Sequence, residues 1–172
     1  MAPDMREVAG AAITRSVLDL AEVIAARTVA AYLSIGTEPA TQYLVEALRS
    51  RDVRVVVPVL RDDLDLDWAE YDGMNHLAQG LRGLWTPEGA LLGVDAVADA
   101  DVVVVPALAV DDLGVRLGRG GGSYDRALAR VPAGRAVIAL LYDGERRAAV
   151  PAERHDRRVT TLVTPSGVLR FA

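Results

Sequence analysis

The stretch ADVVVVPAL, residues 100–108, is the strongest indication of the fold in this sequence. Four consecutive valines followed by a proline are typical of a strand that is buried on both faces. Similar apolar runs occur at residues 28–35 (TVAAYLSI), 53–60 (VRVVVPVL) and 135–142 (RAVIALLY). These runs predict the strands of a buried, mostly parallel sheet.

Helical patterns separate these runs along the chain. Apolar residues recur at helical spacing in residues 6–27, 38–51 and 124–130, with charged residues on the other positions. Alternation of such helices with buried strands predicts an α/β fold, in which a mostly parallel sheet is covered on both faces.

Three further segments have weaker patterns. Residues 63–74 alternate leucine and tryptophan with acids, which predicts a half-exposed strand. Residues 75–93 are rich in glycine and predict a loop, and residues 159–171 predict one more strand and a turn.

Composition excludes several classes of function. The 172 residues predict one domain, and the net charge of -5 argues against general binding of nucleic acid. The sequence contains no lysine and no cysteine, which excludes Schiff-base lysines, phosphate-loop lysines, disulfides and thiolate zinc sites. We expect a cytoplasmic protein without membrane contact, because the sequence has neither a membrane-spanning apolar run nor a signal-peptide pattern at its start.

The segment VRLGRGGGSYD, residues 115–125, follows the valine run and precedes a predicted helix. Its glycines allow backbone N–H groups to approach an anion, and Arg116, Arg119 and Arg126 add paired donors suited to phosphate. Asp125 fits a Mg²⁺ ion held together with nucleotide phosphates. The loop therefore indicates a magnesium nucleotide.

Other interpretations of this loop remain open. The P-loop motif fails for want of a lysine, and the dinucleotide motif G-x-G-x-x-G fails because Ser123 stands at its last position. The segment could also be a glycine-rich surface loop in which Asp125 caps the next helix.

A longer stretch, VVVPALAVDDLGVRLGRGGGSYDRAL at residues 103–128, resembles the signature of the 5-formyltetrahydrofolate cyclo-ligase family, also called methenyltetrahydrofolate synthetases. Four other segments resemble the family in the same order along the chain. They are YLSIGTEPAT (32–41), VVVPVL (55–60), GLRGLWTPEG (80–89) and VPAERHDRRV (150–159). The resemblance covers nearly the whole chain.

The resemblance implies a fold and an activity. The fold is a three-layer α/β/α sandwich, Rossmann-like and related to those of sugar-phosphate isomerases and coenzyme A transferases. The activity is the conversion of 5-formyltetrahydrofolate, possibly polyglutamylated, to 5,10-methenyltetrahydrofolate, with ATP and Mg²⁺ as cofactors. The family's mechanism phosphorylates the formyl oxygen, after which N10 attacks the activated carbon and phosphate leaves.

The resemblance also implies site residues. Arg119 would be catalytic, and Asp125 would be a magnesium ligand. The ATP-binding residues would be Arg116, Leu117, Gly118, Arg119, Gly120, Gly121, Gly122, Ser123 and Tyr124. The folate-binding residues would be Leu33, Glu38, Arg119, Gly120, Gly121, Gly122 and Ser123. A monomer is expected.

Four departures from the family pattern stand out. The chain lacks the family's first helix with its K-x-x-L-R pattern, so the single domain at residues 1–172 is expected to be shorter at its N-terminus. Ser123 replaces an aromatic residue, Thr86 replaces a glutamate and Thr160 replaces a second magnesium ligand. These departures leave a weakened or inactive binder of folate or nucleotide as the alternative.

Some candidate residues also have simpler explanations. Glu38 could be an ordinary first-turn acid, and His155 with Asp156 could be a solvated turn rather than a metal site. Trp68 and Trp85 are more often packing residues than stacking platforms for a ligand.

Overall fold

The computed structural model describes residues 3–151 and 157–171 and contains a central seven-stranded sheet. The strands lie in the order β11 (Gly167–Arg170), β10 (Thr161–Thr164), β9 (Ala136–Leu140), β6 (Val102–Pro106), β1 (Thr28–Ala30), β2 (Arg54–Leu60) and β3 (Leu66–Glu70). Neighbours from β10 to β2 are parallel, whereas β11 and β3 form antiparallel edges. The predicted mostly parallel sheet is confirmed.

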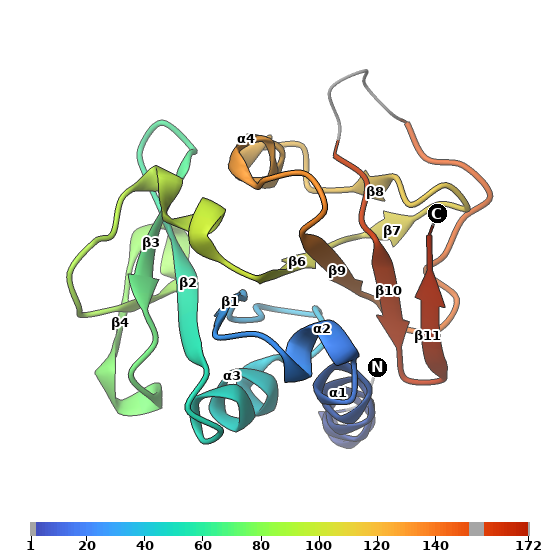
Figure 1. Cartoon of the computed structure of the whole chain (residues 1–172), viewed down its shortest axis with the longest axis horizontal. Helices are drawn as coiled ribbons and strands as arrows, with labels where there is room; N and C mark the ends of the chain where they lie inside the picture. The colour runs from blue at the N-terminus through green and yellow to red at the C-terminus, as the bar shows by residue number, and fades with distance from the viewer. Residues whose placement is uncertain (1–2, 152–156, 172) are drawn as a thin grey trace.

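Helices cover both faces of this sheet, as Figure 1 shows. One face carries α1 (Pro3–Leu18), α2 (Ala21–Ile24) and α3 (Gln42–Arg49). The other face carries α4 (Ser123–Arg130) and the 3-10 helix η3 (Val94–Asp99). The three-layer α/β/α sandwich is therefore confirmed.

The strand β6 is a continuous apolar run in the sequence because both of its faces are buried. Val102 and Val104 pack into the core beneath α1–α3, and Val103 and Val105 pack into the core beneath α4. Each is at most 1% exposed, because successive side chains of a strand point to opposite faces and both faces are covered.

The single helix predicted over residues 6–27 is wrong, because the structure divides this segment into α1 and α2. The chain leaves the helix after Leu18, passes through an extended Leu20 (φ -70°, ψ 132°) and resumes as α2. The break turns Leu20 into the core, where 7% of it is exposed, together with Val23. Burial of apolar side chains thus overrides a pattern that fits one long helix.

The strand predicted over residues 63–74 is confirmed as β3, but its half-exposed character is wrong. Leu66, Trp68 and the acid Asp67 are all buried, the last at 5% exposure. Asp67 is tolerated because its Oδ1 accepts hydrogen bonds from the N–H groups of Trp68 (2.7 Å) and Gly93 (2.8 Å). The segment around Gly93 therefore covers this part of β3.

The loop predicted over residues 75–93 is also corrected. It contains a small antiparallel hairpin of β4 (Leu77–Gln79) and β5 (Trp85–Pro87), flanked by the 3-10 turns η1 (Met74–His76) and η2 (Leu81–Gly83). Near the C-terminus the chain forms two strands, β10 and β11, where one was predicted. None of the helices in the described part of the chain is long and apolar enough to span a membrane.

Candidate functional site

A cavity of about 280 Å³ opens at the carboxyl ends of β1 and β6. Tyr32 and Leu33 reach it from the segment after β1, and residues 106–108 reach it from the end of β6. Clefts at the carboxyl ends of neighbouring strands are where open α/β sheets bind their ligands.

A hydrogen-bonded turn fixes the wall that follows β1. The hydroxyl of Thr41 donates to the carbonyl of Tyr32 (2.6 Å) and accepts from the N–H of Ser34 (2.9 Å). The N–H of Thr41 in turn donates to the Ser34 hydroxyl at 3.2 Å. The short polar residues of the sequence YLSIGTEPAT thus hold Leu33 and Glu38 against the cavity.

The glycine loop forms the opposite part of the wall. A short hairpin of β7 (Ala109–Val110) and β8 (Arg116–Leu117) leads into residues 118–122, which end at the start of α4. Gly120 and Gly122 have φ of 83° and 66°, a backbone conformation that side chains rarely adopt. Gly122 directly precedes α4, so the loop and the positive end of the helix dipole lie together.

Arg116 is the buried cation of this wall. Its side chain is 4% exposed, and its Nη2 donates to Oδ1 of Asp125 at 2.5 Å. Its Cζ lies 5.8 Å from the centre of the Tyr124 ring. Gly118 leaves room for this guanidinium, because a Cβ there would lie 2.8 Å from Nη1 of Arg116.

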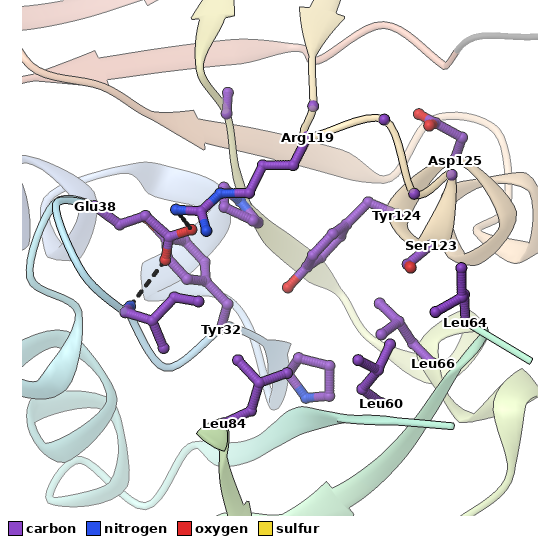
Figure 2. Close-up of a pocket in the computed structure, with 18 of the residues that line it drawn as sticks. Tyr32, Glu38, Leu60, Leu64, Leu66, Leu84, Arg119, Ser123, Tyr124 and Asp125 are labelled. Carbon is purple, nitrogen blue, oxygen red and sulfur yellow. Dashed lines mark hydrogen bonds and ion pairs between the residues drawn. The ribbon is translucent and has the colours of Figure 1, made fainter. Parts of the chain in front are cut away.

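Arg119 and Glu38 bridge the cavity between the two walls. Nη2 of Arg119 lies 3.1 Å from Oε1 of Glu38, and Oε2 of Glu38 accepts the N–H of Ile35 at 2.9 Å (Figure 2). The Glu38 side chain is 12% exposed, whereas that of Arg119 is 55% exposed. Burial raises the pKa of Glu38, although the Ile35 N–H and the Arg119 charge oppose the shift.

The remainder of the cavity is mainly apolar and aromatic. Figure 2 shows Leu60, Leu64, Leu66 and Leu84 on the side facing Arg119, with the Tyr124 ring between them and the loop. Burial raises the pKa of the Tyr124 hydroxyl above its ordinary value, so the phenol stays neutral. Such a surface suits a flat, neutral ring system placed next to a charged group.

The structure brings nearly all of the predicted site residues together. All of them line the cavity except Leu117, which pairs with Ala109 in the β7–β8 hairpin. The sequence interpretation missed Arg82 and Leu64 as lining residues. The signal that could have found Arg82 is the segment GLRGLWTPEG (80–89), which contains this residue and resembles a segment of the family.

Two of the substituted positions, Thr86 and Thr160, lie at different places relative to the cavity. Thr86 belongs to β5, next to Trp85, which lines the cavity. Thr160 immediately precedes β10, on the side of the amino ends of the parallel strands, whereas the cavity lies at the carboxyl ends. The Thr160 hydroxyl accepts a hydrogen bond from the N–H of Val137 and donates one to its carbonyl, both at 3.0 Å. In this chain Thr160 joins β10 to β9.

Three further candidate residues are Trp68, His155 and Asp156. Trp68 is a core residue at 1% exposure. His155 and Asp156 lie outside the described residues. Within residues 3–151 and 157–171, no three histidine or acidic side chains gather as a ready-made metal cage.

Comparison with known proteins gives a consistent result. The model of the 5-formyltetrahydrofolate cyclo-ligase family matches residues 1–165. The 5-formyltetrahydrofolate cyclo-ligase of Mycolicibacterium smegmatis is 42% identical over 147 residues, which are 83% of this chain and 75% of that protein. The enzyme of the same name from Escherichia coli is 30% identical over 171 residues, covering 98% of this chain and 94% of that protein.

Solved structures agree with the sequence relatives. The NMR structure of 5,10-methenyltetrahydrofolate synthetase from Aquifex aeolicus superposes with a TM-score of 0.83 at 25% identity, over 99% of this chain and 84% of that one. The Mycoplasma pneumoniae 5,10-methenyltetrahydrofolate synthetase gives a TM-score of 0.74 at 18% identity, over 96% and 90% of the two chains, and supports the fold. The chain therefore belongs to the 5-formyltetrahydrofolate cyclo-ligase family.

Proposed function

We propose that the cavity between the glycine loop and Glu38 binds ATP together with 5-formyltetrahydrofolate and closes the folate ring. Family membership makes this protein an enzyme of folate one-carbon metabolism, which converts 5-formyltetrahydrofolate to 5,10-methenyltetrahydrofolate. The observation that carries the assignment to this cavity is that one wall offers phosphate-binding groups and the other offers Glu38.

The glycine loop is suited to the phosphoryl-transfer step. In that step the formyl oxygen attacks the γ-phosphorus and the bond to ADP breaks. Charge then spreads over the transferring phosphoryl oxygens, where the guanidinium of Arg119 and the loop N–H groups would stabilise it. Arg116, held by Asp125 at 2.5 Å, would bind a phosphate from a fixed position.

Ring closure needs a dry and rigid site. N10 of the folate attacks the activated formyl carbon, and phosphate leaves with the former formyl oxygen. The apolar wall and Tyr124 would exclude water, which would otherwise compete with N10 for the activated carbon.

Glu38 would fix the position of the pterin. A carboxylate can accept two hydrogen bonds from the neighbouring amino and ring N–H groups of the pterin. Leu33 and Tyr32, which line the cavity near it, would pack against the ring. Arg119 and Glu38 must separate before both can engage ligands, since each is the other's partner in the ligand-free protein.

The residues present fit a magnesium ion that is shared with phosphates. Asp125 gives one oxygen to Arg116, its side chain is 35% exposed, and among the described residues no hydrogen bond uses Oδ2. Mg²⁺ usually takes one or two carboxylates and completes its shell with phosphates and waters. When bound, the ion would neutralise charge on the nucleotide phosphates.

The proposal includes a monomer, because every residue assigned to the two ligands comes from this one chain. Use of ATP and folate fits a cytoplasmic enzyme acting on a small molecule, with monoglutamyl or polyglutamyl substrate.

Incubation of the purified protein with MgATP and 5-formyltetrahydrofolate tests the proposal. We expect the absorbance of 5,10-methenyltetrahydrofolate to rise with release of ADP and phosphate in equal amounts. Folate binding measured by calorimetry without ADP release would instead favour a non-catalytic binder, an alternative that the substitutions at Ser123, Thr86 and Thr160 motivate.

A further inference from the structure

We propose that Arg82 is a specificity-determining residue that binds the carboxylates of the glutamyl tail of the folate at the mouth of the cavity. The inference rests on the proposed function, because it presupposes that folate occupies the cavity. Arg82 lines the cavity and is exposed, which places it at the rim.

The charges that line the cavity single out Arg82. Three arginines line it, and two of them are already paired with carboxylates of the same cavity. Arg116 is paired with Asp125 at 2.5 Å, and Arg119 is paired with Glu38 at 3.1 Å. Within the described residues no carboxylate lies within ion-pair distance of Arg82. Its charge is therefore available to an anionic ligand.

The turn that carries Arg82 is held by backbone hydrogen bonds. The N–H of Gly80 donates to the carbonyl of Leu84 at 2.7 Å. The N–H of Leu84 donates to the carbonyl of Leu81 at 3.1 Å, and the N–H of Gly83 donates to the carbonyl of Gly80 at 3.2 Å. Gly80 is needed for this packing, because a Cβ there would lie 2.2 Å from the hydroxyl of Thr86. The turn thus presents Arg82 in a defined place.

The backbone of Arg82 is strained. Its φ of 56° and ψ of 24° lie in the left-handed region, which glycine adopts freely and arginine does not. Glycine would be the ordinary residue at such a position. Backbone strain of this kind clusters at ligand-binding sites, so it supports a functional use of the Arg82 side chain.

The surroundings of Arg82 match the chemistry of the folate tail. Leu84 and Trp85 follow it in the same hairpin and line the cavity, and Trp85 is 41% exposed. Figure 2 shows Leu84 on the wall that faces Arg119 across the cavity. An apolar and aromatic surface that ends in a cation suits an aryl amide that ends in carboxylates.

The position also favours the tail over the nucleotide phosphates. The phosphate-binding groups, Arg116, Arg119 and the start of α4, belong to the other wall. A cation on the hairpin wall can therefore meet a second anion while those groups hold the first.

Equilibrium binding to four proteins tests the proposal. They are the wild type, Arg82→Gln, Arg82→Lys, and Arg15→Gln, which removes an equal charge from the exposed side of α1. The probes are 5-formyltetrahydropteroate without a tail, the folate with one glutamate, the folate with five glutamates, and a non-hydrolysable MgATP analogue. We expect Arg82→Gln to weaken binding of the tailed folates about fivefold to tenfold. It should leave the tailless probe and the nucleotide analogue unchanged.

Arg82→Lys and one further variant, Arg82→Gly, sharpen the result. Arg82→Lys keeps the charge, so it should retain part of the preference for tailed folates. Arg82→Gly should lose this preference without a lower melting temperature, because glycine relieves the strained backbone. A purely structural role would instead lower the melting temperature.

Three results would overturn the proposal. The first is an unchanged preference for tailed folates in Arg82→Gln. The second is a loss confined to the nucleotide analogue, which would assign Arg82 to phosphate. The third is a wild type that binds no folate probe. Only that third result would also remove the proposed function.

Discussion

Arg119 and Glu38 hold each other across the cavity, with 3.1 Å between Nη2 and Oε1. Arg119 comes from the glycine loop, and Glu38 comes from the hydrogen-bonded turn after β1. The proposed reaction needs each of them for a different ligand. We therefore propose that this ion pair lies where the nucleotide and the folate meet.

Replacement of Arg119 by alanine should impair turnover. Loss of a donor that stabilises the transferring phosphoryl group costs about 2–4 kcal/mol in the transition state, or about 30-fold to 1000-fold in kcat/KM. Steady-state formation of 5,10-methenyltetrahydrofolate measures the loss. Arg15→Ala on α1 is the control, and equal kcat/KM for the two variants would exclude this role for Arg119.

Glu38→Gln should make the ligand-free protein more stable at neutral pH, and the gain should disappear in acid. Because burial raises the pKa of Glu38 above its ordinary 4.5, the folded protein binds more protons than the unfolded chain as the pH passes upward from 4.5 to the folded pKa. The wild type therefore loses stability in that window, whereas the neutral glutamine does not.

Thermal unfolding of both proteins at about pH 4.5 and about pH 7.5 checks this expectation, since the linkage acts as the pH rises above the unfolded pKa of Glu38. A stability difference that is the same at both pH values would contradict it. Folate binding should weaken in the variant at either pH.

Asp125→Asn should have two separable effects. It should raise the Mg²⁺ concentration needed for half-maximal activity, and it should destabilise the ligand-free protein by about 1–3 kcal/mol, because the buried Arg116 loses its counter-charge. Asp112→Asn breaks an exposed ion pair of 2.7 Å with Arg146 and should change stability by less than about 1 kcal/mol. Identical Mg²⁺ titrations for wild type and Asp125→Asn would remove Asp125 as a metal ligand.

Gly118→Ala should destabilise the ligand-free protein by about 1–3 kcal/mol, because the new Cβ would lie 2.8 Å from Nη1 of Arg116 and push it from Asp125. Gly121→Ala is the matched control, since its Cβ would meet only Oγ of Ser123 at an ordinary 3.6 Å. Urea unfolding of both variants separates them. Equal stability would show that Gly118 does not make room for Arg116.

The sequence predicts the sheet and the cavity walls well for a physical reason. The valines of β6 are buried on both faces and so appear as one unbroken apolar run. The glycine loop lies beyond this strand and the β7–β8 hairpin in the sequence, and its Gly120 and Gly122 have the positive φ that glycine favours.

Other features depend on contacts between distant residues. The break at Leu20 follows from burial against the sheet, and the burial of Asp67 depends on Gly93, which lies 26 residues away. The partners of Arg116 and Arg119 likewise become visible only in the folded chain. Periodicity within a short window cannot show such pairings.

The most direct test of the account is single-turnover product formation by the wild type and by Arg119→Ala, each saturated with MgATP and 5-formyltetrahydrofolate. The account predicts that the wild type forms 5,10-methenyltetrahydrofolate and ADP in equal amounts, and that the variant forms both more slowly by the same factor. Product formed by the wild type without ADP, or at equal rates in the two proteins, would contradict it.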